Sequence, residues 1–328
     1  MSIQHEQKIN KIVSVVGPTA SGKTHFALKI AQQALNALNE IRFSGIDIIS
    51  VDSRQVYKGL EILTGADIPN GFEQVAAHGN FEFPYFRNTS LPISLHGISI
   101  IDFKQEWSVA HFKDFATKII LNSFENNRLP ILVGGTGLYH QYLFSSDSNL
   151  YVPPNARVRK AAVHLGLNEL QHWLEKVAAK KLAEMNNSDR NNPRRLVRAI
   201  EIALGAPNTT QTLSLPANHW REMYGMNVPL EQLQSNIVLR VKERFRNGAI
   251  TEVKTLLQAC EKQDLPICST LGVGDISDFL SGKSSEKECQ ENWALHEFQY
   301  AKRQLTWFQK QKDIIWLDDL QKKQYTFR

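Results

Sequence analysis

The sequence predicts an α/β protein, a doubly wound and mainly parallel sheet with an inserted helical domain. Three observations support this fold class. Apolar strand-like runs alternate with amphipathic helical runs in the first half, a glycine-rich motif stands between the first strand and the first helix, and the composition changes after about Ser145. The length of 328 residues and the hydrophobic content of 42% allow about two domains and exclude a disordered or collagen-like chain.

The period of the apolar residues predicts the elements of the first half. The strand candidates are Lys11–Val16, Asp47–Asp52, Ile98–Phe103 and Leu129–Val133. Helices are expected at Lys23–Leu38 and Ser108–Asn127, with Ser108 as an N-cap. Ligands of doubly wound sheets bind outside the carboxyl ends of the strands, so the residues that follow each strand are the candidates for function.

The second half begins with a predicted helical insertion. From Pro153 to about Ser214 the chain is rich in Arg, Lys, Asn and Ala and has helical patterning without a convincing strand. We expect residues 1–150 to form the first part of the core, 151–235 the insertion and 236–328 the rest of the core. After the insertion, the predicted elements are a returning strand at Asn236–Leu239, helices at Glu243–Leu257 and Ser285–Gln311, and a closing strand at Asp313–Leu317.

Composition limits where the protein works and what it binds. The apolar runs are shorter than the roughly 18 residues of a membrane span, and the polar N-terminus has no apolar signal core, so a cytoplasmic protein without membrane contact is expected. Cys260, Cys268 and Cys289 are odd in number and form no CxxC pair, which favours inert thiols over a disulfide framework or a zinc site. A net charge of +5 permits a polyanionic partner but does not select one.

Residues 17–24, GPTASGKT, match the phosphate-loop pattern G-x-x-x-x-G-K-[ST] between a predicted strand and a predicted helix. Gly17 and Gly22 let the backbone approach an anion closely, Lys23 adds a full positive charge, and the Thr24 hydroxyl can hold Mg²⁺. The fold is therefore expected to be P-loop NTPase-like. The motif does not identify the phosphate compound, because kinases, other ATP-binding NTPases and further nucleotide-binding transferases share it.

Two other strand ends carry polar groups. Asp52 leaves the end of its predicted strand, where it could coordinate Mg²⁺, act as a base towards a nucleophile, or merely cap a turn. Thr136 follows another strand in the segment GGTGLY, whose glycines permit close approach of a ligand. Taken alone, a glycine-rich structural turn explains Thr136 nearly as well.

Taken together, these segments resemble a known family. GPTASGKT, SVDSRQVYKGLEILTGA, WSVAHFKDFA, LPILVGGTGLY, NPRRLVRAIE and AKRQLTWF, with a closing IIWLD, resemble in order and spacing the tRNA dimethylallyltransferases, also called tRNA isopentenyltransferases. The similarity runs from about Ile12 to Leu317. The chain departs from the family pattern at Val273, where the family has Tyr in a Gly-Tyr pair, and at Glu297-Phe298, where it has Thr-Arg.

The resemblance implies a prenyl transfer assisted by Mg²⁺. In that family the P-loop holds the diphosphate of dimethylallyl diphosphate, and the dimethylallyl group passes to the exocyclic amino group of an adenosine beside the anticodon of tRNA. Asp52 matches the general base and is expected to be ionised, Thr136 matches a threonine near the reacting centre, and Lys23 would stabilise the leaving diphosphate. The partners implied are dimethylallyl diphosphate and a tRNA anticodon stem-loop, and a monomer is expected.

The resemblance also implies two sets of binding residues. Those for the diphosphate are Gly17, Pro18, Thr19, Ala20, Ser21, Gly22, Lys23, Thr24, Arg240 and Arg244, with Thr24 as the metal ligand. Those for tRNA are Asp52, Ser53, Arg54, Gln55, Thr136, Arg159, Arg194, Arg195, Leu196, Val197 and Arg198. Without the resemblance, the basic clusters would be assigned to solvated helix faces.

Three alternatives remain open at this point. A prenyltransferase that acts on free adenylate would not need the basic insertion. A P-loop kinase would consume ATP without a prenyl donor. A catalytically silent RNA-binding paralogue is suggested by the departures at Val273, Glu297 and Phe298, although Lys23, Thr24, Asp52 and Thr136 are all present.

Overall fold

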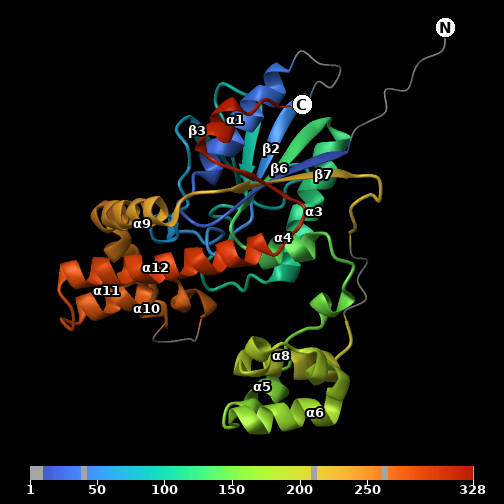
Figure 1. Cartoon of the computed structure of the whole chain (residues 1–328), viewed down its shortest axis with the longest axis vertical. Helices are drawn as coiled ribbons and strands as arrows, with labels where there is room; N and C mark the ends of the chain where they lie inside the picture. The colour runs from blue at the N-terminus through green and yellow to red at the C-terminus, as the bar shows by residue number, and fades with distance from the viewer. Residues whose placement is uncertain (1–9, 38–42, 208–212, 261–264, 328) are drawn as a thin grey trace. The chain divides into compact units, whose positions relative to one another are not determined.

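A computed structural model describes residues 10–37, 43–207, 213–260 and 265–327 of the chain (Figure 1). Its centre is an eight-stranded sheet in the order β3-β4-β5-β2-β6-β1-β7-β8. Every neighbouring pair is parallel except for β4, which is antiparallel to both β3 and β5. The predicted fold class is confirmed.

The strands are short and mostly buried. Their bounds are β1 (Lys11–Val16), β2 (Gly45–Ser50), β3 (Phe72–Val75), β4 (Tyr85–Asn88), β5 (Ile93–His96), β6 (Arg128–Gly134), β7 (Trp220–Met226) and β8 (Ile314–Leu317). Every residue of β1 and β2 is buried, as expected for central strands of a parallel sheet that is covered on both faces.

Residues 1–144 together with 214–328 form one compact unit, and residues 145–213 form a second. The helices of the first are α1 (Lys23–Asn36), α2 (Glu61–Thr64), α3 (Val109–Glu125), α4 (Gly137–Leu143), α9 (Leu230–Arg244), α10 (Ile250–Cys260), α11 (Val273–Leu280), α12 (Glu286–Gln309) and α13 (Asp319–Gln324). Those of the second are α5 (Ala156–Ala162), α6 (Leu167–Glu184), α7 (Asn187–Arg190) and α8 (Pro193–Leu204). Short 3-10 turns span Ser148–Tyr151 and Pro266–Ser269, and a π-turn at Phe245–Ala249 joins α9 to α10.

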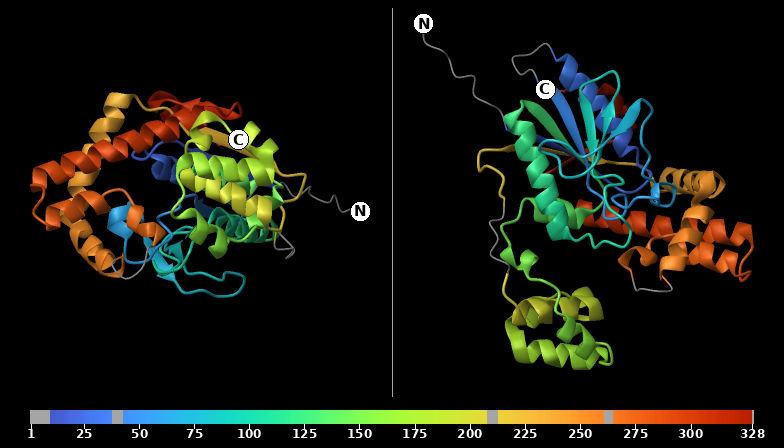
Figure 2. Two further views of the ribbon diagram at one scale, coloured as in Figure 1. Left: turned by 90° about the horizontal axis from the view of Figure 1, so that it is seen from below. Right: turned by 180° about the vertical axis from the view of Figure 1, so that it is seen from behind.

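Alternating side chains of the sheet enter two cores. In β1, Ile12 belongs to the core under α3, whereas Val13 and Val15 belong to the core under α1. Figure 1 shows α1 on one side of the sheet, and the view from behind in Figure 2 shows α3 on the other. Ser108 caps α3 as predicted, because its hydroxyl accepts from the N–H of His111.

The strand predicted at Ile98–Phe103 is wrong. The strand lies five residues earlier, at β5, and it ends because Gly97 and Ser99 have positive φ angles of 83° and 51°. Within the predicted range, Ile101 makes only an isolated bridge to Tyr57. The run is apolar because it packs under α3 as an irregular segment.

The returning strand predicted at Asn236–Leu239 is also wrong, because these residues lie inside α9. The buried residues of α9 include Leu233, Ile237 and Val241, which recur every four positions as in an amphipathic helix. The strand that does return to the sheet is β7, which begins earlier and pairs with β1. A short apolar run fits a strand and a buried helix equally well, and here the helical contacts of α9 with α12 decide.

The expectation of inert thiols is wrong for two of the three cysteines. Cys260 at the end of α10 and Cys268 in the 3-10 turn form a disulfide, with Cα atoms 6.1 Å apart. Cys289 is free and buried in α12. The pairing places the 3-10 turn beside the end of α10, a contact that the eight-residue spacing does not reveal.

The second unit is a small helical domain with its own apolar core. Val158, Leu170, Leu174, Leu196 and Ile200 from α5, α6 and α8 are buried together. Within the described ranges of both units, no helix is long and apolar enough to cross a membrane.

Candidate active site

The loop from Gly17 to Gly22 joins β1 to α1. These two glycines have φ angles of +145° and +81°, which other residues rarely adopt, and a Cβ at residue 17 would come within 3.1 Å of Cβ of Met226. Lys23 begins α1, and its Nζ donates to the carbonyl of Pro18 at 2.5 Å. The N–H groups of a first helical turn have no partner within the helix, so they can bind an anion here.

The ammonium group of Lys23 titrates near neutrality. Burial and then the positive charge of Arg240 lower the pKa of Lys23 to about 7, while the carboxylate of Asp52 opposes this shift. A bound anion would favour the charged lysine. Lys23 is therefore suited to carry a full positive charge when a phosphate ligand is bound.

Asp52 stands two residues after the end of β2. Its Oδ1 accepts from the backbone N–H of Arg54 at 2.7 Å and of Gln55 at 3.3 Å. Burial raises the pKa of Asp52, although these hydrogen bonds and the charges of Lys23 and Arg54 oppose the rise. A carboxylate whose pKa lies above the ordinary value is a stronger base once ionised, so this position suits proton transfer.

The segment after β6 packs closely against the end of β2. A Cβ at Gly134 would overlap the carbonyl of Val51, and the N–H of Thr136 donates to that same carbonyl at 3.3 Å. The two strand ends therefore meet backbone to backbone. This contact brings Thr136 to the edge of the sheet at which Asp52 lies.

A cavity of about 850 Å³ lies at these strand ends, within the first unit. Of the residues predicted from the sequence, those that line it are Thr19, Ala20, Ser21, Gly22, Lys23, Thr24, Asp52, Ser53, Arg54, Gln55, Arg240 and Arg244. Gly17, Pro18 and Thr136 are not among the lining residues. The phosphate loop and the candidate base thus share one cavity.

The two arginines of α9 reach this cavity already paired with carboxylates. Arg240 donates to Asp67 at 2.6 Å and to the hydroxyl of Thr19 at 3.3 Å. Arg244 is buried and donates to Glu297 of α12 at 2.5 Å. An ion pair therefore holds Arg244 against α12, and a hydrogen bond to Thr19 together with the ion pair to Asp67 holds Arg240 at the phosphate loop.

Sequence reasoning assigned no role to three side chains of the AKRQ segment and its neighbour. Tyr300, Arg303 and Gln304 of α12 line the cavity. Burial and the charge of Asp52 raise the pKa of Tyr300 to about 12, so its hydroxyl stays protonated beside Thr136. The i, i+3, i+4 spacing on one helix was the available signal, because it places all three on one face.

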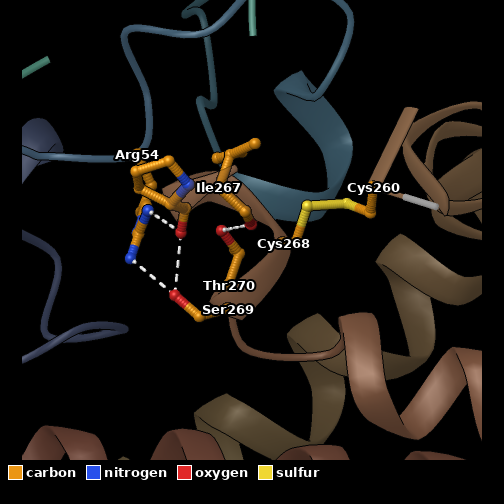
Figure 3. Close-up of a disulfide and its surroundings, with 7 residues drawn as sticks. Arg54, Cys260, Ile267, Cys268, Ser269 and Thr270 are labelled. Atoms are coloured by element: carbon orange, nitrogen blue, oxygen red, sulfur yellow. Dashed lines mark hydrogen bonds between the residues drawn. A yellow bond between two sulfur atoms is a disulfide. The ribbon is translucent and has the colours of Figure 1, made fainter. Parts of the chain in front are cut away.

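Arg54 is anchored by the turn Pro266–Ser269, which carries one cysteine of the disulfide (Figure 3). Its guanidinium donates to the carbonyl of Pro266 at 2.8 Å and to the hydroxyl of Ser269 at 3.3 Å. Cys268, between them in the chain, is bonded to Cys260 at the end of α10. The disulfide therefore ties the turn that holds Arg54 to the end of α10.

The remaining predicted residues lie in the second unit. Glu201 is buried and binds Arg159 at 2.8 Å and Arg198 at 3.3 Å. Burial raises the pKa of Glu201, but the hydrogen bonds from Arg159 and Asn155 outweigh it and hold the pKa below its usual value. The carboxylate thus orders two of the predicted RNA-binding arginines.

The other predicted residues of α8 differ in exposure. Arg194 is exposed, Arg195 is exposed and paired with Asp189, Val197 is half-buried, and Leu196 is fully buried in the core of the unit. Of these four residues, only Arg194 and Arg195 are exposed. They follow Pro193 at the start of α8, and Asn192 caps that helix.

The described residues contain no group of three or more His, Cys, Asp or Glu side chains arranged to hold a metal ion. The hydroxyl of Thr24 is exposed on the cavity wall. Mg²⁺ commonly takes only one or two protein ligands and completes its shell with phosphate oxygens and water. Thr24 at the start of α1 fits that donor set.

Comparison with known proteins is consistent with this geometry. The model of a family described as IPP transferase matches residues 88–311. The chain is 33% identical over 316 residues to tRNA dimethylallyltransferase 1 of Azobacteroides pseudotrichonymphae genomovar. CFP2, an alignment that covers 94% of this chain and 93% of the relative. It is 31% identical over 324 residues to the tRNA dimethylallyltransferase of Halalkalibacterium halodurans, with 94% and 91% covered.

Solved structures share the fold. The full-length tRNA isopentenylpyrophosphate transferase of Bacillus halodurans superposes with a TM-score of 0.62 at 29% identity, and 94% of this chain and 90% of that one are covered. A eukaryotic dimethylallyltransferase acting on tRNA has the same fold, with a TM-score of 0.71 at 21% identity and coverages of 96% and 76%.

Proposed function

This chain belongs to the tRNA dimethylallyltransferase family, and we propose that it transfers a dimethylallyl group from dimethylallyl diphosphate to the exocyclic amino group of an adenosine beside the anticodon of tRNA. One observation carries the proposal. The phosphate loop with Lys23 and the carboxylate of Asp52 line the same cavity, so a diphosphate donor and an amino acceptor can meet there.

The diphosphate binds at the start of α1. The N–H groups of Gly22, Lys23 and Thr24 and the ammonium of Lys23 supply positive charge to it. When the bond between the allylic carbon and the diphosphate oxygen breaks, negative charge grows on that oxygen. Groups already fixed around it stabilise the transition state more than the ground state.

Magnesium is the proposed metal, with Thr24 as its protein ligand. Its Lewis acidity would neutralise part of the charge on the leaving diphosphate. The exposed hydroxyl of Thr24 on the cavity wall supports this assignment, because that side chain can join a shell completed by phosphate oxygens and water.

Asp52 receives the proton of the acceptor. The amino nitrogen forms a bond to the allylic carbon as the diphosphate leaves, and one amino proton passes to the carboxylate of Asp52. The backbone N–H groups of Arg54 and Gln55 fix the orientation of that carboxylate. The protonated hydroxyl of Tyr300, which lines the cavity, is the donor for the acceptor base, and the buried hydroxyl of Thr136 orients Tyr300 beside it.

The tRNA contacts are proposed to come from Ser53, Arg54 and Gln55 at the cavity and from the arginines of the second unit. Arg194 and Arg195 are exposed there, and Arg159 and Arg198 are ordered by Glu201. Guanidinium groups held by a carboxylate retain donors for phosphate. An adenosine in a single-stranded loop leaves its stack at a cost of roughly a few kcal/mol, so it can reach the cavity more easily than a paired base would. The chain is proposed to act as a monomer.

The test is transfer of labelled dimethylallyl groups, with Mg²⁺, to an adenosine-containing anticodon stem-loop and in parallel to AMP. We expect label on the stem-loop alone, and its loss in Asp52→Asn. Asp313→Asn is the matched control, because Asp313 is exposed and is not among the residues that line the cavity. Label on AMP would indicate a prenyltransferase that acts on free adenylate. ATP consumption without a prenyl donor would indicate a kinase.

A further inference from the structure

Gln304 joins two loops that follow the neighbouring strands β1 and β6 at the edge of the cavity. Its Oε1 accepts from the backbone N–H of Thr19 at 2.8 Å, and its Nε2 donates to the backbone carbonyl of Gly135 at 3.0 Å. Thr19 lies in the phosphate loop, and Gly135 immediately precedes Thr136. A single side chain of α12 thus bonds to both segments, 285 and 169 residues away in the chain.

The orientation of this amide is determined by its partners. A backbone N–H can only donate and a carbonyl can only accept, so the Gln304 amide has one arrangement that satisfies both. The side chain is buried, with 7% of the residue exposed. Either hydrogen bond, once lost, would leave a buried polar group without a partner.

The contact is also close enough to exclude a side chain at residue 135. A Cβ there would overlap Nε2 of Gln304 and come within 3.1 Å of the carbonyl of Gly17. The absence of a side chain at Gly135 therefore lets the amide reach the backbone of both loops. The amide of Gln304 thus spans the gap between Thr19 and Gly135, just beyond the paired ends of β1 and β6.

We propose that Gln304 is a positioning residue, which sets the spacing between the diphosphate held by the phosphate loop and the acceptor base beside Thr136. This inference rests on the proposed function. Its bonds to Thr19 and Gly135 are to the backbone, and its side chain also contacts the hydroxyl of Tyr300, so it acts through the loops and Tyr300 and does not need to touch either substrate. The N–H of Thr19 is consequently assigned to Gln304, and the diphosphate is left with the N–H groups of Ala20 to Thr24.

The chemistry explains why this spacing matters. The allylic carbon is fixed by the phosphate loop through the diphosphate, and the attacking nitrogen is fixed on the side of Asp52 and Thr136. A shift of about 1 Å between two reacting groups lowers a rate on the order of a hundredfold. Binding of each substrate alone depends on one side only, so it is less sensitive to the spacing.

Two substitutions separate these effects. Gln304→Glu keeps the acceptor for Thr19 but loses the donor for Gly135, and Gln304→Met loses both while retaining the length and volume of the side chain. We expect the single-turnover rate at saturating dimethylallyl diphosphate and stem-loop to fall by on the order of tenfold to a hundredfold. The dissociation constant of the stem-loop should stay within about threefold of the unaltered protein. Gln309→Met, on the exposed end of the same helix, is the matched control.

A second measurement does not depend on activity. Hydrogen exchange at the Thr19 N–H should accelerate in Gln304→Met, while the N–H groups of α12 stay protected. Unchanged exchange at Thr19, or a wild-type single-turnover rate in a folded Gln304→Met protein, would overturn the inference. A loss of stem-loop affinity with an unchanged rate would also overturn it, because Gln304 would then act on RNA binding.

The two proposals fail separately. If the unaltered protein transfers no label to RNA, the proposed function is wrong, and exchange at Thr19 still decides whether Gln304 holds the loop. If the unaltered protein transfers label and both Gln304 variants match it, the positioning role alone is wrong.

Discussion

Glu297 of α12 forms a buried ion pair with Arg244 of α9, with 2.5 Å between the carboxylate oxygen and the guanidinium nitrogen. The same oxygen accepts from the indole N–H of Trp293 at 3.0 Å. Glu297 stands where the family resembled by this sequence has a threonine. An arginine that the resemblance assigns to the diphosphate therefore has a negative partner of its own in this chain.

Removal of that negative partner should destabilise the protein. In Glu297→Gln the buried guanidinium of Arg244 loses its counter-charge, so we expect the free energy of unfolding to fall by about 3 kcal/mol. Urea denaturation measures it. The double variant Arg244→Met with Glu297→Leu should lose less, and Glu291→Gln, which breaks an exposed pair with Lys287, should change stability by less than about 1 kcal/mol. Equal decreases in the free energy of unfolding for Glu297→Gln and Glu291→Gln would contradict this explanation.

The pH dependence of donor capture should reflect Lys23 and Asp52. The pKa of Lys23 is lowered to about 7, so the free enzyme loses this positive charge as pH rises through that value. The pKa of Asp52 is raised, so the base is lost as pH falls through a value above its ordinary range. We therefore expect kcat/KM for dimethylallyl diphosphate to be highest at an intermediate pH and to fall at both lower and higher pH. Lys23→Arg should remove the alkaline limb near 7 and leave the acidic limb in place.

The disulfide should contribute to stability and to RNA binding. Reduction, or Cys268→Ser, releases the turn that holds Arg54, so we expect unfolding to become easier by about 2–3 kcal/mol. KM for the stem-loop should rise severalfold while KM for the prenyl donor stays unchanged. The measurement is steady-state transfer with and without a reductant. The double variant Cys260→Ser with Cys268→Ser should be insensitive to the reductant. If reduction of the unaltered protein changed KM for the prenyl donor as well, this would count against the role of Arg54 in RNA binding.

The arginines of the second unit should account for part of the salt dependence of RNA binding. Arg194 is exposed at the start of α8, and Arg194→Ala should reduce the slope of log affinity against log salt by about 0.7, the value for one single-strand phosphate. Filter binding of tRNA over a range of salt concentrations measures it. Lys180→Ala is the control, because Lys180 is 88% exposed on α6 and has only a distant partner in Glu184. An unchanged slope in Arg194→Ala would remove this residue from the RNA surface.

Much of the fold is determined by local patterns in the sequence. The prediction for β1 agrees with the structure residue for residue, and the cap at Ser108 is present. These features depend on residues within one or two turns of each other, such as the alternation of a strand or a hydroxyl next to a helix start. The phosphate loop could be located for the same reason. Its motif has a fixed place between a strand and a helix, so the sequence shows where its polar groups lie.

The wrong predictions arose where a local sequence pattern is compatible with two different structures. Asn236–Leu239 fits a strand by composition, but its neighbours Leu233 and Val241 make it part of the helix that packs on α12. The pairing of Cys260 with Cys268 depends on the contact between the end of α10 and the turn Pro266–Ser269. Neither outcome is contained in the residues immediately around it.

The sequence by itself determined the strands β1, β2, β6 and β8, the phosphate loop, the position of Asp52 after its strand and the resemblance to a family. The tertiary structure alone decided that α12 completes the cavity, with Tyr300 beside Thr136, Glu297 against Arg244 and Gln304 between two loops. The physical reason is the range of the interactions. Helix caps and strand periods act between near neighbours, whereas a bond from Gln304 to Thr19 spans 285 residues and exists only after the sheet and α12 have packed.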